Sequence, residues 1–249
     1  MTYLWCLHGN LQTPAVWAEL KRELESPTLT FKLENLAASL PPQFEDAFKV
    51  WTNDFCSRVE ALPNAKHVLL GYSLGGRLGF HALLECPQLW TGAIIIAADP
   101  GLPNEKAKTK QLAHDQAWAQ RWLEGDWNDL WRDWNAQGIF AGRENMAQPS
   151  EAELSRGKIS QTFDSFSKGR QADLRPRLAQ LDTLPILYVS GENDNKYNDL
   201  GIELTVLCPK LIHKTVLDAA HRVPWENPAE FIELVKNFLK QIEAQAHAF

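Results

Sequence analysis

Short apolar runs alternate with helical patterns along most of this chain, and few folds are compatible with that order. Runs that are almost continuously apolar are typical of strands covered on both faces of a sheet. Strand followed by helix, repeated, predicts a parallel sheet with right-handed crossovers. The predicted strands are 2–7, 28–33, 67–72, 92–98, 185–191 and 213–218, and helices are predicted at 14–25, 43–62 and 75–86.

The last helix has the clearest pattern. Asn227 is suited to cap it, and Pro228 is suited to its first turn. An apolar stripe follows at helical spacing, made by Phe231, Leu234, Val235, Phe238 and Ile242. These features together predict an amphipathic helix that closes the fold.

Residues 100–170 interrupt the alternation. This stretch contains five of the ten tryptophans of the chain, at helical spacings: Trp118, Trp122, Trp127, Trp131 and Trp134. We predict a helical insertion over approximately 100–170 that sits as a cap between the two halves of the sheet. The length of 249 residues suits a single domain, 1–249, that carries this cap.

Composition excludes several classes of function. There are 25 Lys and Arg against 31 Asp and Glu, a net charge of −6, which argues against a general binder of nucleic acid or of anionic membranes. No apolar run approaches the roughly 20 residues of a membrane span, and the first residues do not resemble a signal peptide. The four cysteines are scattered, so we expect reduced, packed thiols in a cytoplasmic protein.

The sequence Gly71-Tyr72-Ser73-Leu74-Gly75 lies between a predicted strand and a predicted helix. Gly-x-Ser-x-Gly in that position is typical of a nucleophile elbow, which holds a serine with its hydroxyl exposed above the sheet edge. The two glycines are expected where side chains would collide with neighbouring backbone. The alternative is an ordinary Ser/Gly turn that caps a helix.

A serine at such an elbow needs a histidine later in the chain. His213 opens a predicted strand and His247 lies in a tail, whereas His221 follows the strand 213–218 and precedes the final helix. We therefore predict that His221 takes the proton of Ser73.

The acid that orients this histidine is expected at the end of the preceding strand. The polar turn after 185–191 offers Asp194, which we predict to be the partner of His221, with Glu192 and Asp199 as alternatives.

An oxyanion hole requires two backbone N–H groups. One is expected from Leu74, directly after the serine, and the other from the loop after the first strand. There Gly9 permits a close approach, so the amide of Asn10 is our prediction, with His8 as a structural anchor of the loop.

Four segments in this order resemble the α/β-hydrolase superfamily, and the resemblance covers nearly the whole chain. They are "LHGN", "GYSLGG", "SGENDNKY" and "AAHRVPWENP". The resemblance implies an α/β-hydrolase fold, a mostly parallel sheet flanked by helices, with a Ser-His-Asp triad of Ser73, His221 and Asp194.

Within that superfamily the chain is most similar to the 2-succinyl-6-hydroxy-2,4-cyclohexadiene-1-carboxylate synthases of menaquinone biosynthesis. The segments that carry this similarity are "GYSLGGR", "DPGL", "DWNAQGIF", "QADLRPRL" and the "H…ENP" ending. It implies a lyase that expels pyruvate from a carboxylate-rich substrate, in which the serine acts as a base rather than as an acylated nucleophile.

Arg77 lies one helical turn after Ser73, so its guanidinium can reach the same pocket opening as the serine hydroxyl. We predict that it binds a substrate carboxylate, because its planar fork pairs with carboxylates in a bidentate manner. The alternative is a surface salt bridge. The similarity further implies substrate contacts by Trp134 and Arg156 from the cap.

The chain departs from the synthase pattern at Gln111, which stands where the family has a second arginine. Lys108 or Lys110 is a possible replacement. The substrate is expected to be a small anion, with no cofactor, no metal, no nucleic acid and no membrane partner. The second interpretation of the same triad is a serine carboxylesterase or thioesterase. The third is a non-catalytic binding protein with this fold.

Overall fold

The computed structural model describes residues 1–42, 46–62, 65–145 and 148–245. Its centre is a six-stranded sheet in the order β2-β1-β3-β4-β5-β6, and every neighbouring pair is parallel. The strands are β1 (Thr2–Leu7), β2 (Leu29–Glu34), β3 (Lys66–Tyr72), β4 (Gly92–Ile96), β5 (Ile186–Gly191) and β6 (Leu211–Val216). The predicted parallel sheet is confirmed.

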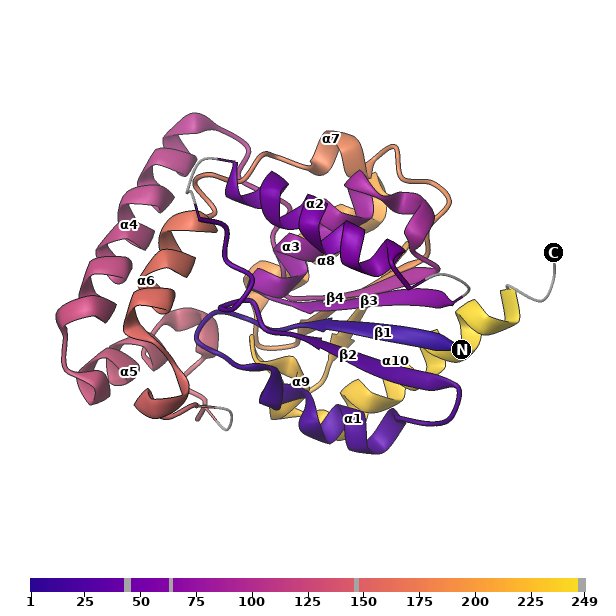
Figure 1. The fold of residues 1–249 in the computed structure, drawn as a ribbon, viewed down its shortest axis with the longest axis horizontal. Helices are drawn as coiled ribbons and strands as arrows, with labels where there is room; N and C mark the ends of the chain where they lie inside the picture. Colours follow the sequence, from indigo (N-terminus) through magenta and orange to yellow (C-terminus); the bar gives the residue numbers. More distant parts are fainter. Residues whose placement is uncertain (43–45, 63–64, 146–147, 246–249) are drawn as a thin grey trace.

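Helices cover both faces of this sheet (Figure 1). On one face lie α1 (Ala18–Leu24) and α10 (Pro228–Gln245), and on the other α2 (Ala47–Glu60) and α3 (Leu74–Glu85). Residues 43–45, where the helix 43–62 was predicted to begin, lie outside the described residues. The cap predicted for α10 is present, since the Glu230 amide donates to Asn227 Oδ1 at 3.3 Å.

A second group of helices lies beyond the carboxyl ends of the strands, between β4 and β5 in the chain (Figure 1). It consists of α4 (Glu105–Glu124), α5 (Trp127–Asn135) and α6 (Arg156–Ser165). These helices share a small apolar core of their own, in which Trp118, Trp122 and Trp131 are buried. Most of the tryptophan-rich segment therefore packs on itself. The three helices α4, α5 and α6, which we call the roof, cover the carboxyl ends of the strands.

Shorter helices complete the connections. The chain leaves the roof through α7 (Arg175–Leu178), β5 leads into α8 (Asn195–Leu207), and β6 leads into α9 (Val223–Glu226). Helix α8 packs against β5 and β6. The turns between these strands and helices carry the polar residues of the site.

The prediction of four reduced cysteines is wrong for one pair. Cys56 and Cys86 form a disulfide, with their Cα atoms 6.5 Å apart. The pair forms because α2 and α3 pack side by side, which brings the two residues within the distance that a disulfide spans. Cys6 and Cys208 are free and buried, as expected.

Candidate active site

Ser73 stands at the sharp turn from β3 into α3. Its backbone has φ 50° and ψ −109°, a strained conformation for a residue with a side chain. A Cβ on Gly71 would lie 2.5 Å from the Gly75 carbonyl oxygen, and a Cβ on Gly75 would lie 2.2 Å from the Leu7 carbonyl oxygen. Only glycine fits at both positions, so the turn is tight enough to present the serine at the sheet edge.

His221 lies in the loop after β6 and reaches Ser73 across the end of the sheet. Its Nε2 is 3.2 Å from Ser73 Oγ, and its Nδ1 is 2.9 Å from Asp194 Oδ2. A carboxylate can only accept a hydrogen bond, so Nδ1 carries the proton and Nε2 is the acceptor that faces the serine. Three distant segments thus meet in one hydrogen-bonded chain.

Asp194 follows β5 and is only 3% exposed. Its second oxygen, Oδ1, accepts a hydrogen bond from the Tyr197 amide at 3.3 Å and caps α8. This bond fixes the carboxylate against the imidazole. The alternative acids, Glu192 and Asp199, are exposed, and among the described residues the carboxylate that contacts His221 Nδ1 is that of Asp194.

The other late histidines do not join the site. His213 Nε2 bonds to Ser190 Oγ at 2.7 Å, on the neighbouring strand. His247 lies outside the described residues.

The pKa of His221 is lowered from its usual value of 6.5, and burial is the main cause because it disfavours the imidazolium. The Asp194 carboxylate opposes this shift, while Lys196 and Arg222 reinforce it. The imidazole is therefore neutral at pH 7 and able to accept a proton.

The loop after β1 lies against the start of α3. The Gly75 amide donates to the His8 carbonyl at 3.0 Å. The His8 ring contacts the Gly9 carbonyl at 2.8 Å and accepts from the Leu36 amide at 3.2 Å, which suits a structural anchor. Asn10 lines the same cavity as Ser73, and Leu74 follows the serine directly. Their amides remain the predicted oxyanion donors.

A cavity of about 460 Å³ is lined by Ser73 and His221 and also by residues of α4, α5 and α6. Its walls are partly aromatic, with Trp134 and Phe140 among the lining residues. The basic side chains in the lining are Arg77, Lys168, Lys196 and Arg222, and the only carboxylate in the described lining is Asp115. The lining thus combines aromatic side chains with several positive charges, and the Arg222 guanidinium lies over the Phe140 ring.

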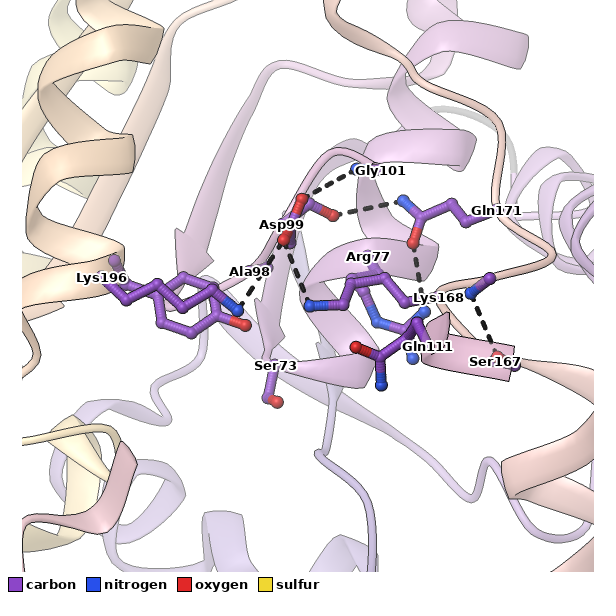
Figure 2. A network of polar contacts seen from close by, with 12 residues as sticks. Ser73, Arg77, Ala98, Asp99, Gly101, Gln111, Ser167, Lys168, Gln171 and Lys196 are labelled. Atoms are coloured by element: carbon purple, nitrogen blue, oxygen red, sulfur yellow. Dashed lines mark hydrogen bonds and ion pairs between the residues drawn. The ribbon is translucent and has the colours of Figure 1, made fainter. Parts of the chain in front are cut away.

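Arg77 is buried, with 8% of its surface exposed. Its guanidinium donates to the Phe166 carbonyl at 2.7 Å and to Gln171 Oε1 at 3.1 Å, as Figure 2 shows for Gln171. No ion pair joins Arg77 to a carboxylate within 4.0 Å in the described part of the chain. Burial lowers its pKa. The hydrogen-bond partners of this buried cation are neutral, and the carboxylates of Asp115 and Asp99 act on its charge without forming an ion pair with it.

The structure places Trp134 in the cavity wall, where its ring packs on Trp118 and Phe163. Arg156 is not brought to the cavity, contrary to the prediction. Its guanidinium donates to the Trp122 and Gly125 carbonyls at 3.1 and 2.8 Å, at the end of α4. The carboxyl end of a helix leaves carbonyls without partners, and Arg156 satisfies them.

Gln111 does line the cavity, and its amide donates to Asp115 Oδ1 at 2.8 Å. Neither Lys108 nor Lys110 is among the lining residues, and Lys108 pairs with Glu105 at 2.9 Å. The positive charge near Gln111 comes instead from Lys168, on the segment after α6.

Three basic residues of the lining were missed in the sequence: Lys168, Lys196 and Arg222. Two of them had a usable signal, because Lys196 follows Asp194 by two residues and Arg222 follows His221 directly. Lys168 lies far from any strand end and offered none.

Within the described ranges, no group of three or more His, Cys, Asp or Glu side chains is arranged to hold a metal ion. In the same ranges, no helix has the length and apolarity needed to cross a membrane.

The family comparison matches residues 6–234 to the alpha/beta hydrolase family. Two curated relatives are 2-succinyl-6-hydroxy-2,4-cyclohexadiene-1-carboxylate synthases. That of Citrobacter koseri is 30% identical over 179 residues, which cover 70% of this chain and 69% of the relative. That of Pectobacterium atrosepticum is 28% identical over 243 residues, covering 95% and 93%.

The structure of MenH from S. aureus superposes with a TM-score of 0.84 at 19% identity, covering 97% of this chain and 94% of that one. The match supports the fold, and the family model spans all of the segments that position Ser73, Asp194 and His221. On this evidence, the chain belongs to the alpha/beta hydrolase family.

Proposed function

We propose that this protein is a lyase of the 2-succinyl-6-hydroxy-2,4-cyclohexadiene-1-carboxylate synthase type, which eliminates pyruvate from a carboxylate-rich substrate. The observation that carries the proposal is the buried guanidinium of Arg77, which lines the cavity that contains Ser73, donates only to neutral acceptors and is ion-paired with no carboxylate among the described residues. A buried cation is costly unless an opposite charge reaches it. An ester with a neutral acyl group would leave that charge unmatched.

The arrangement of the triad suits proton abstraction. Neutral His221 accepts the hydroxyl proton of Ser73, and the serine oxygen then removes a proton from a substrate carbon. The electron pair of that C–H bond forms a new double bond, and the C–O bond to the leaving group breaks. The leaving group departs as the enolate of pyruvate, and a proton returned to it completes the reaction.

The positive charges of the lining lower the energy of this step. Negative charge develops on the serine oxygen, on the substrate carbon and on the departing enolate. Arg77 and Lys168 are largely buried, and charges in a buried site stabilise developing anions more than they would in bulk water.

A serine carboxylesterase or thioesterase is the second candidate, because the distance of 3.2 Å between His221 Nε2 and Ser73 Oγ equally suits an attacking serine. In that reaction Ser73 would become acylated, and the Asn10 and Leu74 amides would hold the oxyanion.

The test offers the purified protein two substrates in separate assays. One is the pyruvate-bearing precursor of 2-succinyl-6-hydroxy-2,4-cyclohexadiene-1-carboxylate, and the other is p-nitrophenyl acetate. Release of pyruvate that is lost in Ser73→Ala, with negligible nitrophenol release, is the expected result. Serine-dependent nitrophenol release without pyruvate would replace the lyase with an esterase.

A further inference from the structure

Two lysines of the cavity share a single carboxylate. Lys168 Nζ lies 3.3 Å from Asp99 Oδ2, and Lys196 Nζ lies 4.0 Å from the same oxygen. Asp99 sits in the loop after β4 and is 5% exposed, whereas both lysines line the cavity with Ser73. One negative charge between two ammonium groups leaves a positive charge that faces the cavity.

Asp99 is held in place and cannot turn toward other cations. Its Oδ1 accepts a hydrogen bond from the Gly101 amide at 3.1 Å, and its carbonyl accepts from Gln171 Nε2 at 3.2 Å. Figure 2 shows dashed lines from the Asp99 carboxylate to the two lysines, with Ser73 drawn nearby. The carboxylate that both lysines share is therefore fixed in place, and Lys168 is held beside it with 12% of its side chain accessible.

This charged position is separate from Arg77 but rigidly connected to it. The amide of Gln171, only 1% exposed, donates to the Asp99 carbonyl through Nε2 and accepts from Arg77 through Oε1. The two cationic positions are thus built on one hydrogen-bonded frame, at a fixed spacing.

We propose that Lys168 and Lys196 form a second anion subsite beside that of Arg77, so that the site takes a ligand with at least two carboxylates. The inference rests on the proposed function, because both subsites belong to the same cavity. It goes further by assigning one carboxylate of the ligand to Arg77 and another to the lysine pair.

The ionisation of Lys168 is consistent with this assignment. Burial and the neighbouring Lys196 lower its pKa to about 8, and Asp99 only partly opposes them. A ligand carboxylate placed against the pair would stabilise the charged form. Lys196 is more exposed, with 54% of its side chain accessible, so it can adjust to the ligand.

Calorimetric binding of simple acids tests the subsite without requiring turnover. The probes are malonate, succinate, glutarate and adipate, each compared with butyrate, which carries one carboxylate. We expect the best dicarboxylate to bind wild-type protein at least about 10-fold more tightly than butyrate, since a charged hydrogen-bonded contact is gained. Wild-type protein that prefers none of the dicarboxylates would overturn the proposal.

The variant Lys168→Gln is expected to lose this preference while its butyrate affinity changes less than about twofold. It should fold, because Lys196 still neutralises Asp99. Lys168→Arg, which keeps the charge, should retain the preference. The matched control is Lys108→Gln, which removes a lysine outside the cavity and should behave as wild type. If Lys168→Gln loses as much affinity for butyrate as for the best dicarboxylate, a subsite for a second carboxylate is contradicted.

The outcome is separable from that of the proposed lyase activity. If pyruvate is not released but Lys168→Gln still removes the preference for dicarboxylates, the subsite stands and the reaction is wrong. If pyruvate is released with the same KM in wild type and Lys168→Gln, the reaction stands and the subsite is wrong.

Discussion

The carbonyl oxygen of Leu7 lies 2.2 Å from the point where a Cβ atom on Gly75 would stand. The end of β1 and the first turn of α3 are therefore in direct backbone contact at this position. Because neither backbone can move without disturbing the sheet, the contact fixes both the serine turn and the loop that carries Asn10.

Gly75→Ala should lose activity and unfold at lower denaturant concentration, with a loss of about 1–3 kcal/mol in unfolding free energy from overpacking. Gly157→Ala is the matched control, since its Cβ would meet nothing closer than 3.9 Å and alanine suits a helix better. Urea titrations followed by circular dichroism measure both. A Gly75→Ala protein as stable as wild type would contradict the packing described.

Ser73→Ala and His221→Ala should each lower kcat by at least about 10³-fold without unfolding the protein, because the proton transfer loses one of its two partners. Asp194→Asn should lower kcat by on the order of 10³–10⁴-fold, since the imidazole loses the acceptor that fixes its tautomer. The exposed Asp199 provides the control, as Asp199→Asn. If Asp199→Asn is impaired as strongly as Asp194→Asn, the assignment of the acid is wrong.

The pH profile should have two limbs. Since burial holds the pKa of His221 below 6.5, kcat/KM should rise with pH through the acid range and level off near pH 6.5. The pKa of Lys168 is lowered to about 8, so KM for a dicarboxylate substrate should rise above pH 8 as that charge is lost. Initial-rate kinetics in wild type and Lys168→Gln check both, and only the alkaline limb should vanish in the variant.

Arg77→Gln should raise KM for the carboxylated substrate by on the order of 10- to 100-fold, because a charged contact is lost. Hydrolysis of a neutral ester, where measurable, should change little. Arg177→Gln is a suitable control, since Arg177 lies on α7 and bonds to the Leu84 carbonyl outside the cavity. Equal losses on the charged and the neutral substrate would favour an esterase.

The disulfide can be tested chemically. Denatured, unreduced protein should react with an alkylating reagent at Cys6 and Cys208 only, which mass spectrometry of peptides reports. The double variant Cys56→Ser/Cys86→Ser should be less stable by about 2–4 kcal/mol, since the cross-link restricts the unfolded chain. Alkylation of all four cysteines without reductant would show that the pair is not bonded.

Much of the fold followed from the sequence because strand and helix periods are local properties. Every strand end was predicted within two residues. The differences of two residues are at both ends of β6, which is Leu211–Val216 where 213–218 was expected, and at the end of β4, which is Ile96 where 98 was expected. Ala97 there has φ 44°, a conformation incompatible with a strand. The meeting of Ser73, Asp194 and His221 was also predictable, because parallel strands bring the turns at their carboxyl ends to one edge.

What the sequence could not reveal depends on how elements pack. Lys168 reaches the site only because the chain leaving α6 passes back over α3, and no local pattern marks that path. The pairing of Cys56 with Cys86 likewise depends on the contact between α2 and α3. The resemblance implied that Arg156 contacts the substrate from the cap. Its guanidinium instead donates to main-chain carbonyls at the end of α4, a contact that depends on how α4 and α6 pack.

The carboxamide of Gln171 has a consequence for altering the ligand range of this protein. It presents a donor at one end and an acceptor at the other, and the two ends face Asp99 and Arg77 respectively. A neutral residue that does not line the cavity therefore braces Arg77 against the main chain of the residue whose carboxylate both lysines contact. Substitutions at position 171 would reach both cationic positions without entering the cavity, and redesign of the ligand range could begin there.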